Sequence, residues 1–424
     1  MKELEGKKLL ILGAGTNELS LVERAQELGV YVIVTDYNLD HMLSPSKDVA
    51  NEYWDISWSD LELLETKCRE SNVDGILSGY SEIRVENNIK LCEKLNLPCY
   101  INMEQLDITR DKIKFKQTCR ENGVPVIKEY SSIDGVDEFP VIVKPTDRAG
   151  SIGISIANNY DELVDAYNYA MEMSLNKTVI IEEYIHKNAK KFDAYYGIVD
   201  GNITFLGTDD VINAKNNGNK KVVQSGWVLP SVHEEDYLVG VDLSLRRMIK
   251  NMGIKNGYIF FSGFSMDDGG FCFFECGFRL CGGYLFNYFP LVGLYSNMDL
   301  LLLHSLTGDC SSVLHERTEK KDIKNVTVNV YLKAGIIQTI KGFEEIKSNP
   351  NCKFSLQECH VGQVCEGDKA ILTRAGIVYF CNENSETLAN DVKCFYDMLC
   401  IKDSKGNDMI YDYIDIDAIR NWWN

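Results

Sequence analysis

The segment VIVKPTDRAGSIGISI (residues 141–156) combines a lysine with a glycine-containing loop, a combination that can bind phosphate groups. An apolar, β-branched run ends at Lys144 and a second one follows the loop. The sequence therefore predicts a strand–loop–strand hairpin rather than the helix-opening turn of a P-loop. Lys144 can reach phosphate oxygens, and the loop, residues 147–153, can cover them as a flap with its backbone N–H groups. The predicted flap contacts are Gly150, Ser151 and Gly153. Taken alone, a plain hairpin with a solvated lysine explains the stretch equally well.

Three other stretches carry side chains suited to a nucleotide and a metal ion. TVIIEEYI (residues 178–185) predicts a strand that ends in two carboxylates and can continue as a linker along an adenine ring. Lys112, in TRDK, is expected to start a helix. Glu275 ends an apolar strand, and Arg279 follows four residues later. A carboxylate beside phosphates can hold Mg²⁺, and an arginine can bind phosphoryl or carboxylate oxygens bidentately. Each of these residues, taken alone, more often has a structural role. Their occurrence in this order along the chain favours a single shared site.

The elements around these residues predict an α/β and α+β protein. Strands and helices alternate over the first hundred residues, which is typical of a parallel, doubly wound sheet. The segment DITRDKIKFKQTCRENGVP predicts a helix that ends at Gly123. Residues 139–283 are largely strands, and a smaller strand-rich unit follows the charged segment at 315–325.

The first strand–helix turn, GAGTNE, is a weak match to a dinucleotide fingerprint. Glu18 stands where the third glycine is expected, although Asp36 closes the second strand. We expect plain strand-to-helix geometry here, and an NAD-dependent oxidoreductase would leave Lys144 and Glu275 without a function.

Composition excludes several classes of protein. The 424 residues carry a net charge of -19, so nucleic acid is not an expected partner. No stretch approaches the roughly 20 apolar residues of a membrane span, and the N-terminus predicts a strand rather than a signal peptide. The fourteen cysteines suit reduced thiols in a cytoplasmic protein. Cysteine sets such as Cys272, Cys276 and Cys281, or Cys359 and Cys365 with His360, lack paired C-x-x-C spacing, so buried thiols are favoured over zinc.

Together these residues resemble the ATP-grasp superfamily, in the branch of the biotin carboxylase and carbamoyl-phosphate synthase ATP domains. The resemblance implies a pre-ATP-grasp α/β domain (1–103), an ATP-grasp domain of two α+β subdomains (104–314) and a C-terminal β-rich domain (325–424). It implies that Lys112 and Lys144 contact phosphates and that Glu275 binds Mg²⁺ or Mn²⁺. Arg279 is the arginine of the family's E-x-N-x-R motif and, with Lys144, is expected to be catalytic. The adenine linker is expected to be Glu182, Glu183, Tyr184 and Ile185.

The chain departs from the family pattern at three positions. Gly277 replaces the asparagine of E-x-N-x-R, and Gly263, beside Ser262, stands where a first magnesium glutamate is expected. Lys191 stands at the usual ribose-binding glutamate, so Asp193 is the expected contact to ATP. Mg²⁺ would have to recruit water and phosphate oxygens for the missing ligands.

The resulting hypothesis is an ATP-dependent ligase that activates a small carboxylic acid as an acyl phosphate and transfers it to an amine. The alternative is an ATP-binding regulatory or scaffold protein with a degenerate metal site. Small-molecule substrates are the expected partners, without nucleic acid or membrane, and a homodimer is possible. We expect SGYSE (78–82) and LCGGYLFNYF (280–289) to line the substrate pocket. Arg84 is a possible contact to an anionic substrate, although a solvated charge is its more common role.

Overall fold

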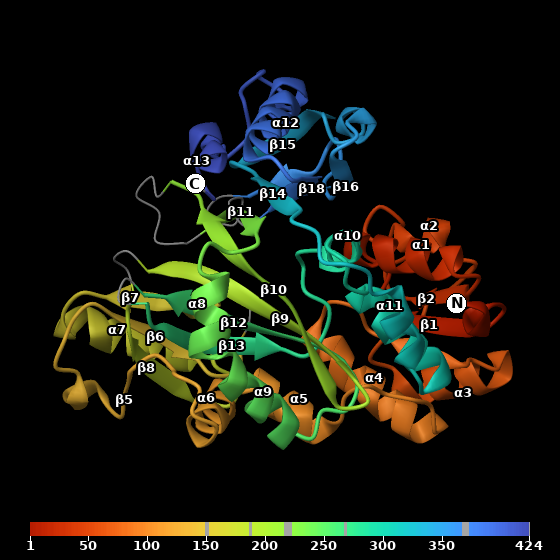
Figure 1. The fold of residues 1–424 in the computed structure, drawn as a ribbon, viewed down its shortest axis with the longest axis horizontal. Helices are drawn as coiled ribbons and strands as arrows, with labels where there is room; N and C mark the ends of the chain where they lie inside the picture. Colours follow the sequence, from red (N-terminus) through yellow and green to blue (C-terminus); the bar gives the residue numbers. More distant parts are fainter. Residues whose placement is uncertain (149–151, 186–188, 216–222, 267–268, 367–372, 424) are drawn as a thin grey trace.

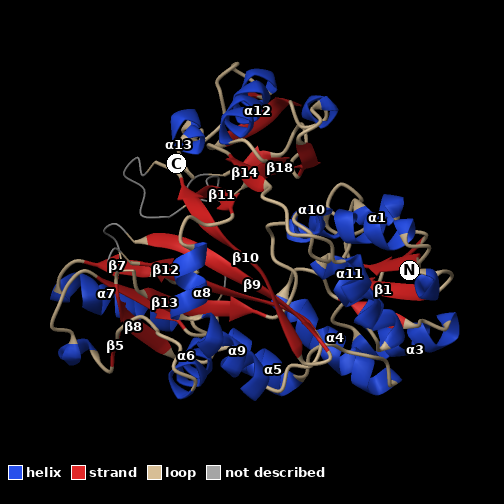
Figure 2. Cartoon of the chain, in the orientation of Figure 1, coloured by secondary structure: helices blue, strands red, loops and turns tan. Residues whose placement is uncertain are grey.

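The computed structural model describes residues 1–148, 152–185, 189–215, 223–266, 269–366 and 373–423 (Figure 1). Its strands form four sheets, and helices cover the sheets on their outer faces (Figure 2). None of the described helices is both long and apolar enough to cross a membrane.

The N-terminal sheet is parallel, as predicted, with strand order β3-β2-β1-β4. Its strands are β1 (Lys8–Leu12), β2 (Tyr31–Thr35), β3 (Glu52–Trp54) and β4 (Gly75–Leu77). Its helices are α1 (Leu19–Glu27), α2 (Ser46–Val49), α3 (Leu61–Ser71) and α4 (Glu82–Leu95). Alternate residues of β1 belong to two different cores, Leu9 and Ile11 to one and Leu10 and Leu12 to the other. Because both faces are buried, these strands are apolar throughout.

The predicted helix through Lys112 is two helices, α5 (Met103–Arg110) and α6 (Lys112–Glu121). Asp111 lies between them with an extended backbone, and its carboxylate accepts hydrogen bonds from the N–H groups of Ile113 and Lys114. The chain leaves α6 at Gly123, which has a positive φ. Lys112 is therefore the first residue of a capped helix, where an anion is favoured.

The predicted hairpin forms two strands of a small antiparallel sheet of order β5-β8-β6-β7. The strands are β5 (Glu129–Tyr130), β6 (Val141–Pro145), β7 (Ser155–Ala157) and β8 (Val179–Glu183). Helix α7 (Tyr160–Met173) packs on this sheet through Leu163, Ala166 and Ala170.

An eight-stranded sheet forms the centre of the molecule, in the order β13-β12-β9-β10-β11-β14-β18-β16. Five strands precede the charged segment: β9 (Lys190–Val199), β10 (Asn202–Asn213), β11 (Gln224–Leu229), β12 (Gly257–Ser265) and β13 (Phe271–Gly277). Three follow it: β14 (Lys324–Tyr331), β16 (Cys352–Gln357) and β18 (Arg374–Asn382). Helices α8 (Glu234–Gly240) and α9 (Asp242–Asn251) lie on the first group. Because β11 pairs with β14, the sheet is continuous across residues 315–325.

The C-terminal region adds a three-stranded sheet and a separate core. Its strands are β15 (Gly335–Lys341), β17 (Val364–Cys365) and β19 (Cys400–Asp403), and its helices are α12 (Ser385–Met398) and α13 (Ile416–Arg420). Before it come α10 (Tyr288–Leu291) and α11 (Asn297–Thr307). Helix α11 is buried over nearly its whole length and packs against both β4 and β12. It therefore joins the N-terminal sheet to the central sheet (Figure 1). The three predicted domain ranges stay predictions.

Candidate nucleotide and metal site

Lys144 forms an ion pair inside the small sheet. It lies on β6, and Glu182 lies on the neighbouring strand β8. Their Nζ and Oε2 atoms are 2.5 Å apart, and the exposed fractions are 5% for Lys144 and 0% for Glu182. The amine that we expect to contact phosphate is thus held at the end of its strand by a buried carboxylate.

A second lysine, which sequence reasoning missed, binds the other oxygen of the same carboxylate. Lys116 on α6 is fully buried, contacts Glu182 Oε1 and lies 3.4 Å from Glu129 Oε1. Burial alone would raise the pKa of Glu182, but the Lys144 and Lys116 ammonium groups hold this pKa below its ordinary value. Lys116 follows Lys112 by four residues, or one helical turn. This i, i+4 spacing places both lysines on one face of α6, and it was the sequence feature that could have identified Lys116. The Lys116–Glu182–Lys144 triad carries one net positive charge.

Lys112 lies close to this triad. Its Nζ donates a 2.9 Å hydrogen bond to the carbonyl of Arg148, at the start of the predicted flap. Burial lowers the pKa of Lys112, and the Lys144 charge lowers it further, whereas Glu275 opposes this. The Lys112 ammonium group therefore lies within electrostatic reach of both Lys144 and Glu275.

The flap is described only in part. Gly150 and Ser151 lie outside the described residues. Gly153 is buried with φ +76°, and a Cβ there would lie 2.6 Å from Pro145 Cγ. A glycine at this position is therefore required by both conformation and space.

The aromatic ring of Phe274 on β13 faces the small sheet. The Nζ atoms of Lys144 and Lys191 lie 5.5 Å and 5.4 Å from the centre of this ring. Because Lys191 belongs to β9, the ring marks the place where the small and central sheets approach each other. The next residue on β13 is Glu275.

Glu275 faces a serine and an aspartate along one row of the central sheet. Its cross-strand partner is Ser262, and the partner of Ser262 on the other side is Asp193. The Ser262 hydroxyl donates a hydrogen bond to Asp193 Oδ1. Burial raises the pKa of Asp193 and the Glu275 charge adds to this, while Lys191 and Ser262 oppose it. Directly opposed residues share one face of a sheet, so the three side chains present oxygen atoms to the same side.

Packing explains both glycines that replace expected metal ligands. A Cβ at Gly263 would lie 2.6 Å from the carbonyl oxygen of Cys272. A Cβ at Gly277 would lie 2.5 Å from the ring of Phe260. The register between β12 and β13 shifts by one residue between Ser262 and Gly263, so Ser262 lies opposite Glu275 and Gly263 opposite Phe273, and Phe274 has no cross-strand partner in this pair.

Arg279 lies between the central sheet and helix α4 of the N-terminal region. Its guanidinium stacks 5.5 Å from the centre of the Phe260 ring and donates to the Leu280 carbonyl at 3.0 Å. Its Nη2 lies 3.7 Å from Oε1 of Glu82, the first residue of α4. The predicted catalytic arginine therefore contacts the SGYSE segment.

The predicted adenine linker continues from the end of β8. The N–H of Glu183 donates to the Lys128 carbonyl at 3.0 Å, and the N–H of Tyr184 donates to the Pro140 carbonyl at 3.2 Å. Tyr184 and Ile185 are half-buried. The side chain of Glu182 is directed to the two lysines, so its expected contribution to an adenine pocket is reduced to its backbone.

The first strand–helix turn holds a carboxylate where a dinucleotide phosphate would lie. Glu18 is 2% exposed, and its Oε1 accepts a 2.7 Å hydrogen bond from Arg84. Burial raises the pKa of Glu18 to about 7, and Arg84 partly opposes this rise. A buried acid at this turn disfavours a pyrophosphate.

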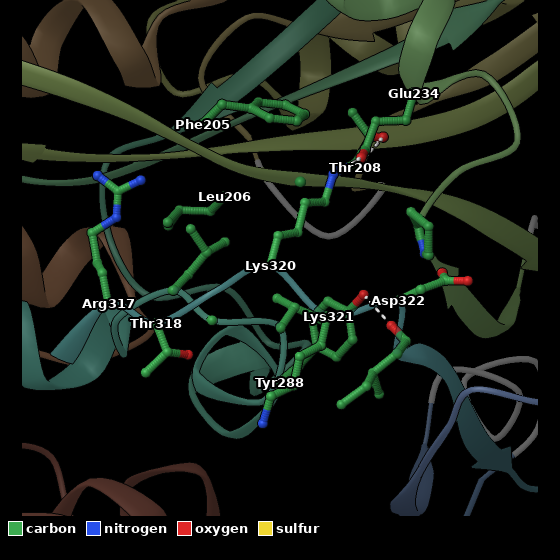
Figure 3. Close-up of a pocket in the computed structure, with 16 residues that line it drawn as sticks. Phe205, Leu206, Thr208, Glu234, Tyr288, Arg317, Thr318, Lys320, Lys321 and Asp322 are labelled. Atoms are coloured by element: carbon green, nitrogen blue, oxygen red, sulfur yellow. Dashed lines mark hydrogen bonds and ion pairs between the residues drawn. The ribbon is translucent and has the colours of Figure 1, made fainter.

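A large cavity lies elsewhere (Figure 3). It has a volume of about 700 Å³ between β10 and residues 317–323, and none of the predicted ATP or metal residues lines it. Lys320 extends toward Thr208 and Glu234, and the Tyr288 hydroxyl donates to the Ile323 carbonyl at 2.9 Å. Its basic side chains are exposed, so size alone does not make it the reaction site.

The oxygen ligands along the central sheet suit Mg²⁺. Within the described ranges, no three His, Cys, Asp or Glu side chains come together as a metal cluster. Mg²⁺ bound by one or two carboxylates and phosphate oxygens does not need such a cluster, so Glu275 and Asp193 fit it. All fourteen cysteines are free thiols.

Known proteins share parts of this sequence. A family model described as the C-terminus of D-Ala–D-Ala ligase matches residues 94–215. The formate-dependent phosphoribosylglycinamide formyltransferase of Prochlorococcus marinus is 28% identical over 191 residues, 42% of this chain and 48% of that protein. The pyruvate carboxylase of Staphylococcus aureus is 28% identical over 284 residues, 60% of this chain and 23% of that protein. The chain spans about half or less of the length of these curated relatives.

Solved structures match almost the whole chain. The L-amino acid ligase from Bacillus licheniformis has a TM-score of 0.76 at 18% identity, over 94% of this chain and 99% of that one. The phosphoribosylglycinamide synthetase from Anaerococcus prevotii has a TM-score of 0.73 at 19% identity, over 94% and 100% of the two chains. Identities this low establish the fold alone. Residues 94–215 therefore match the C-terminal domain of D-Ala–D-Ala ligase, and the overall fold of the chain is the one that these ligase and synthetase structures share.

Proposed function

We propose that this protein is an ATP-dependent carboxylate–amine ligase. It would transfer the γ-phosphoryl group of ATP to a small carboxylic acid, and an amine would then displace phosphate from the acyl phosphate. The main support is the approach of Lys112, Lys144 and Glu275, which come from a helix start and the ends of two strands in different sheets.

Each predicted residue has a role in this proposal. Lys112 and Lys144 bind phosphate oxygens, and Glu182 holds the Lys144 amine in place. The guanidinium of Arg279 binds the acyl phosphate through two N–H groups. Glu183, Tyr184, Ile185 and the backbone of Glu182 form the adenine linker.

Two carboxylates would hold the metal ion. Glu275 and Asp193 would bind Mg²⁺ or Mn²⁺ together with the Ser262 hydroxyl, and the bound ion would neutralise charge on the phosphates. Catalysis by the protein itself is then positioning and charge stabilisation by the lysines and Arg279.

The test is ADP and phosphate release from ATP with a panel of small acids and amines. Lys144→Ala should abolish this release, because the phosphoryl group loses its buried cation. Lys128→Ala is the matched control, since Lys128 is an exposed lysine of the same subdomain. Unchanged release in Lys144→Ala would refute the assigned role of Lys144.

A regulatory ATP-binding protein without turnover is the second candidate. Gly263 and Gly277 favour it, because each removes an expected metal ligand. Calorimetry with ATP in the presence and absence of Mg²⁺ separates the two functions. Metal-independent binding without hydrolysis in any mixture would favour the regulatory protein.

The relatives support small substrates rather than macromolecules. Their names refer to small molecules such as L-amino acids, formate and phosphoribosylglycinamide. One structural neighbour is described as a biotin carboxylase domain dimer. A homodimer stays a prediction for this chain, which size-exclusion chromatography with light scattering would test.

A further inference from the structure

A smaller polar cavity lies where the N-terminal sheet meets the C-terminal region. Its volume is about 320 Å³, at the lower end of the range for small-molecule sites. It opens beside the loops that follow β1 and β4. Strand order reverses between these two strands, and ligands of doubly wound sheets bind at such a point. The lining residues are Gly15, Thr16, Asn17, Glu18, Tyr80, Ser81, Arg84, Glu358, Cys359, Gln363, Thr373 and Arg374.

The cavity has an acid–arginine pair on each of two walls. On the N-terminal wall, Arg84 Nη1 lies 2.7 Å from Oε1 of the buried Glu18. On the C-terminal wall, Arg374 binds both oxygens of Glu358, at 2.8 Å and 2.5 Å. These four side chains are at least four-fifths buried. The site thus contains two guanidinium groups and two carboxyl groups at fixed positions.

This cavity adjoins the predicted reaction centre through one helical turn. Ser81 and Arg84, at the start of α4, line the cavity, whereas Glu82 between them lies 3.7 Å from Arg279. Tyr80 also lines the cavity, and its ring packs 5.2 Å from that of Tyr284. Two residues of the SGYSE segment therefore line this cavity. A ligand here would lie on the far side of one turn of α4 from Arg279.

We propose that this cavity binds a compact zwitterion, an α-amino acid, as a substrate of the ligase proposed above, on which this inference rests. A purely anionic ligand would be attracted by Arg84 and Arg374 but repelled by Glu18 and Glu358. A purely cationic ligand would be attracted by the two glutamates but repelled by the two arginines. A molecule with both charges can place its ammonium near a carboxylate and its carboxylate near a guanidinium. Buried charges require such pairing.

The same charges argue against a phosphorylated substrate. A phosphate monoester carries close to two negative charges at neutral pH, and here it would lie beside two carboxyl groups that are more than four-fifths buried. The names of one structural neighbour and of several curated relatives refer to phosphoribosylglycinamide. This chain would differ from them in substrate class while sharing their fold.

The test measures binding to the full chain, so it does not depend on turnover. The twenty proteinogenic L-amino acids, inorganic phosphate and ribose 5-phosphate are screened by thermal shift, with and without Mg²⁺ and a non-hydrolysable ATP analogue. The Kd of the best ligand is then measured by calorimetry. Its analogues without the ammonium group and without the carboxylate should each bind at least about tenfold more weakly, the loss of one charged contact.

Substitutions on the two walls of the cavity test whether the ligand binds between them. Glu18→Gln and Glu358→Gln should each weaken amino-acid binding at least about tenfold. Glu23→Gln, whose side chain lines a different cavity, should leave it unchanged. Glu358→Gln, on the facing wall, tests the same binding mode independently of Glu18. The inference is overturned if no amino acid binds, if ribose 5-phosphate or inorganic phosphate binds more tightly, or if both wall variants bind like the parent chain.

Nucleotide binding in the same calorimetry series keeps the two proposals apart. ATP that binds in a Lys144-dependent manner, without amino-acid binding, would refute the zwitterion site and leave the ligase proposal intact. Amino-acid binding without any ATP binding would support the site and refute the ligase.

Discussion

Replacing Lys116 by methionine tests whether the buried triad positions the phosphate-binding amine. Methionine keeps most of the volume of the lysine stem but removes its charge. Glu182, which is fully buried, would then pair with Lys144 alone across 2.5 Å. The net charge of the triad falls from one to zero, so the Lys144 amine becomes committed to Glu182 and less available to phosphate.

The expected magnitude follows from burial. Removing one partner from a buried ion pair typically costs about 3 to 5 kcal/mol, and Lys144 still neutralises Glu182, so we expect about 3 kcal/mol of lost unfolding free energy. We also expect ATP affinity to fall at least about tenfold, which corresponds to about 1.4 kcal/mol. The control is Lys114→Met on the same helix, because Lys114 also forms an ion pair, with Asp107, but is exposed. An exposed pair contributes at most about 1 kcal/mol.

Urea unfolding measures the stability of both variants, and calorimetry measures their ATP affinity. The double variant Lys116→Met, Glu182→Gln restores the net charge of one. Its loss of unfolding free energy should therefore be smaller than the sum of the losses in the two single variants. If Lys116→Met were as stable as Lys114→Met and bound ATP like the parent chain, the positioning role of the triad would be wrong.

Three further predictions concern single side chains. The pKa of Glu18 is about 7 in the folded chain, whereas its ordinary value is 4.5. Between these two pH values the folded chain keeps a proton that the unfolded chain has lost. The stability that this group contributes is therefore fully present below pH 4.5 and is lost as the pH rises through 7. Glu18→Gln should gain up to about 3 kcal/mol relative to the parent chain between pH 4.5 and 8 in urea unfolding, and a constant difference would contradict the raised pKa. Gly153→Ala should lower stability by about 1 to 3 kcal/mol, because φ is +76° and the new methyl group would lie 2.6 Å from Pro145; an unchanged urea midpoint would contradict this geometry. Asp193→Asn should weaken Mn²⁺ binding in the presence of ATP, measured by electron paramagnetic resonance, while metal-free ATP binding changes little; equal Mn²⁺ binding would remove Asp193 from the metal site.

Much of the fold was readable in the sequence because local patterns determine it. Apolar strands alternating with amphipathic helices predicted the N-terminal parallel sheet, and Lys144 was correctly placed at the end of a hairpin strand. The break between α5 and α6 could also have been read, since Asp111 is a favoured helix N-cap. Pairing between β11 and β14 could not, because nothing local specifies partners about a hundred residues apart.

The sequence indicates candidate site residues by type but not their exact register in the sheets. A lysine, a carboxylate and an arginine at element ends indicate phosphate chemistry from sequence alone. The bulge at Phe274 on β13, however, changes the register next to Glu275, and one residue of slip exchanges the faces of a strand. Lys116 was missed because its partner Glu182 lies 66 positions away. Its spacing from Lys112 was visible in the sequence, but its burial and its pairing with Glu182 follow only from the packing of α6 against β8.

The Phe260 ring contacts Arg279 and also limits which residue fits at position 277. The Phe260 ring lies 2.5 Å from where a Cβ at Gly277 would be, and the same ring lies 5.5 Å from the Arg279 guanidinium. An asparagine at 277 therefore cannot be accommodated while Phe260 supports Arg279. We expect Gly277→Asn alone to destabilise the chain by about 1 to 3 kcal/mol through overpacking. With Phe260→Ala added, the asparagine should fit, which urea unfolding would show as a smaller loss than the two single changes predict. If Gly277→Asn alone were as stable as the parent chain, the missing metal ligand would not be a consequence of how Arg279 is held.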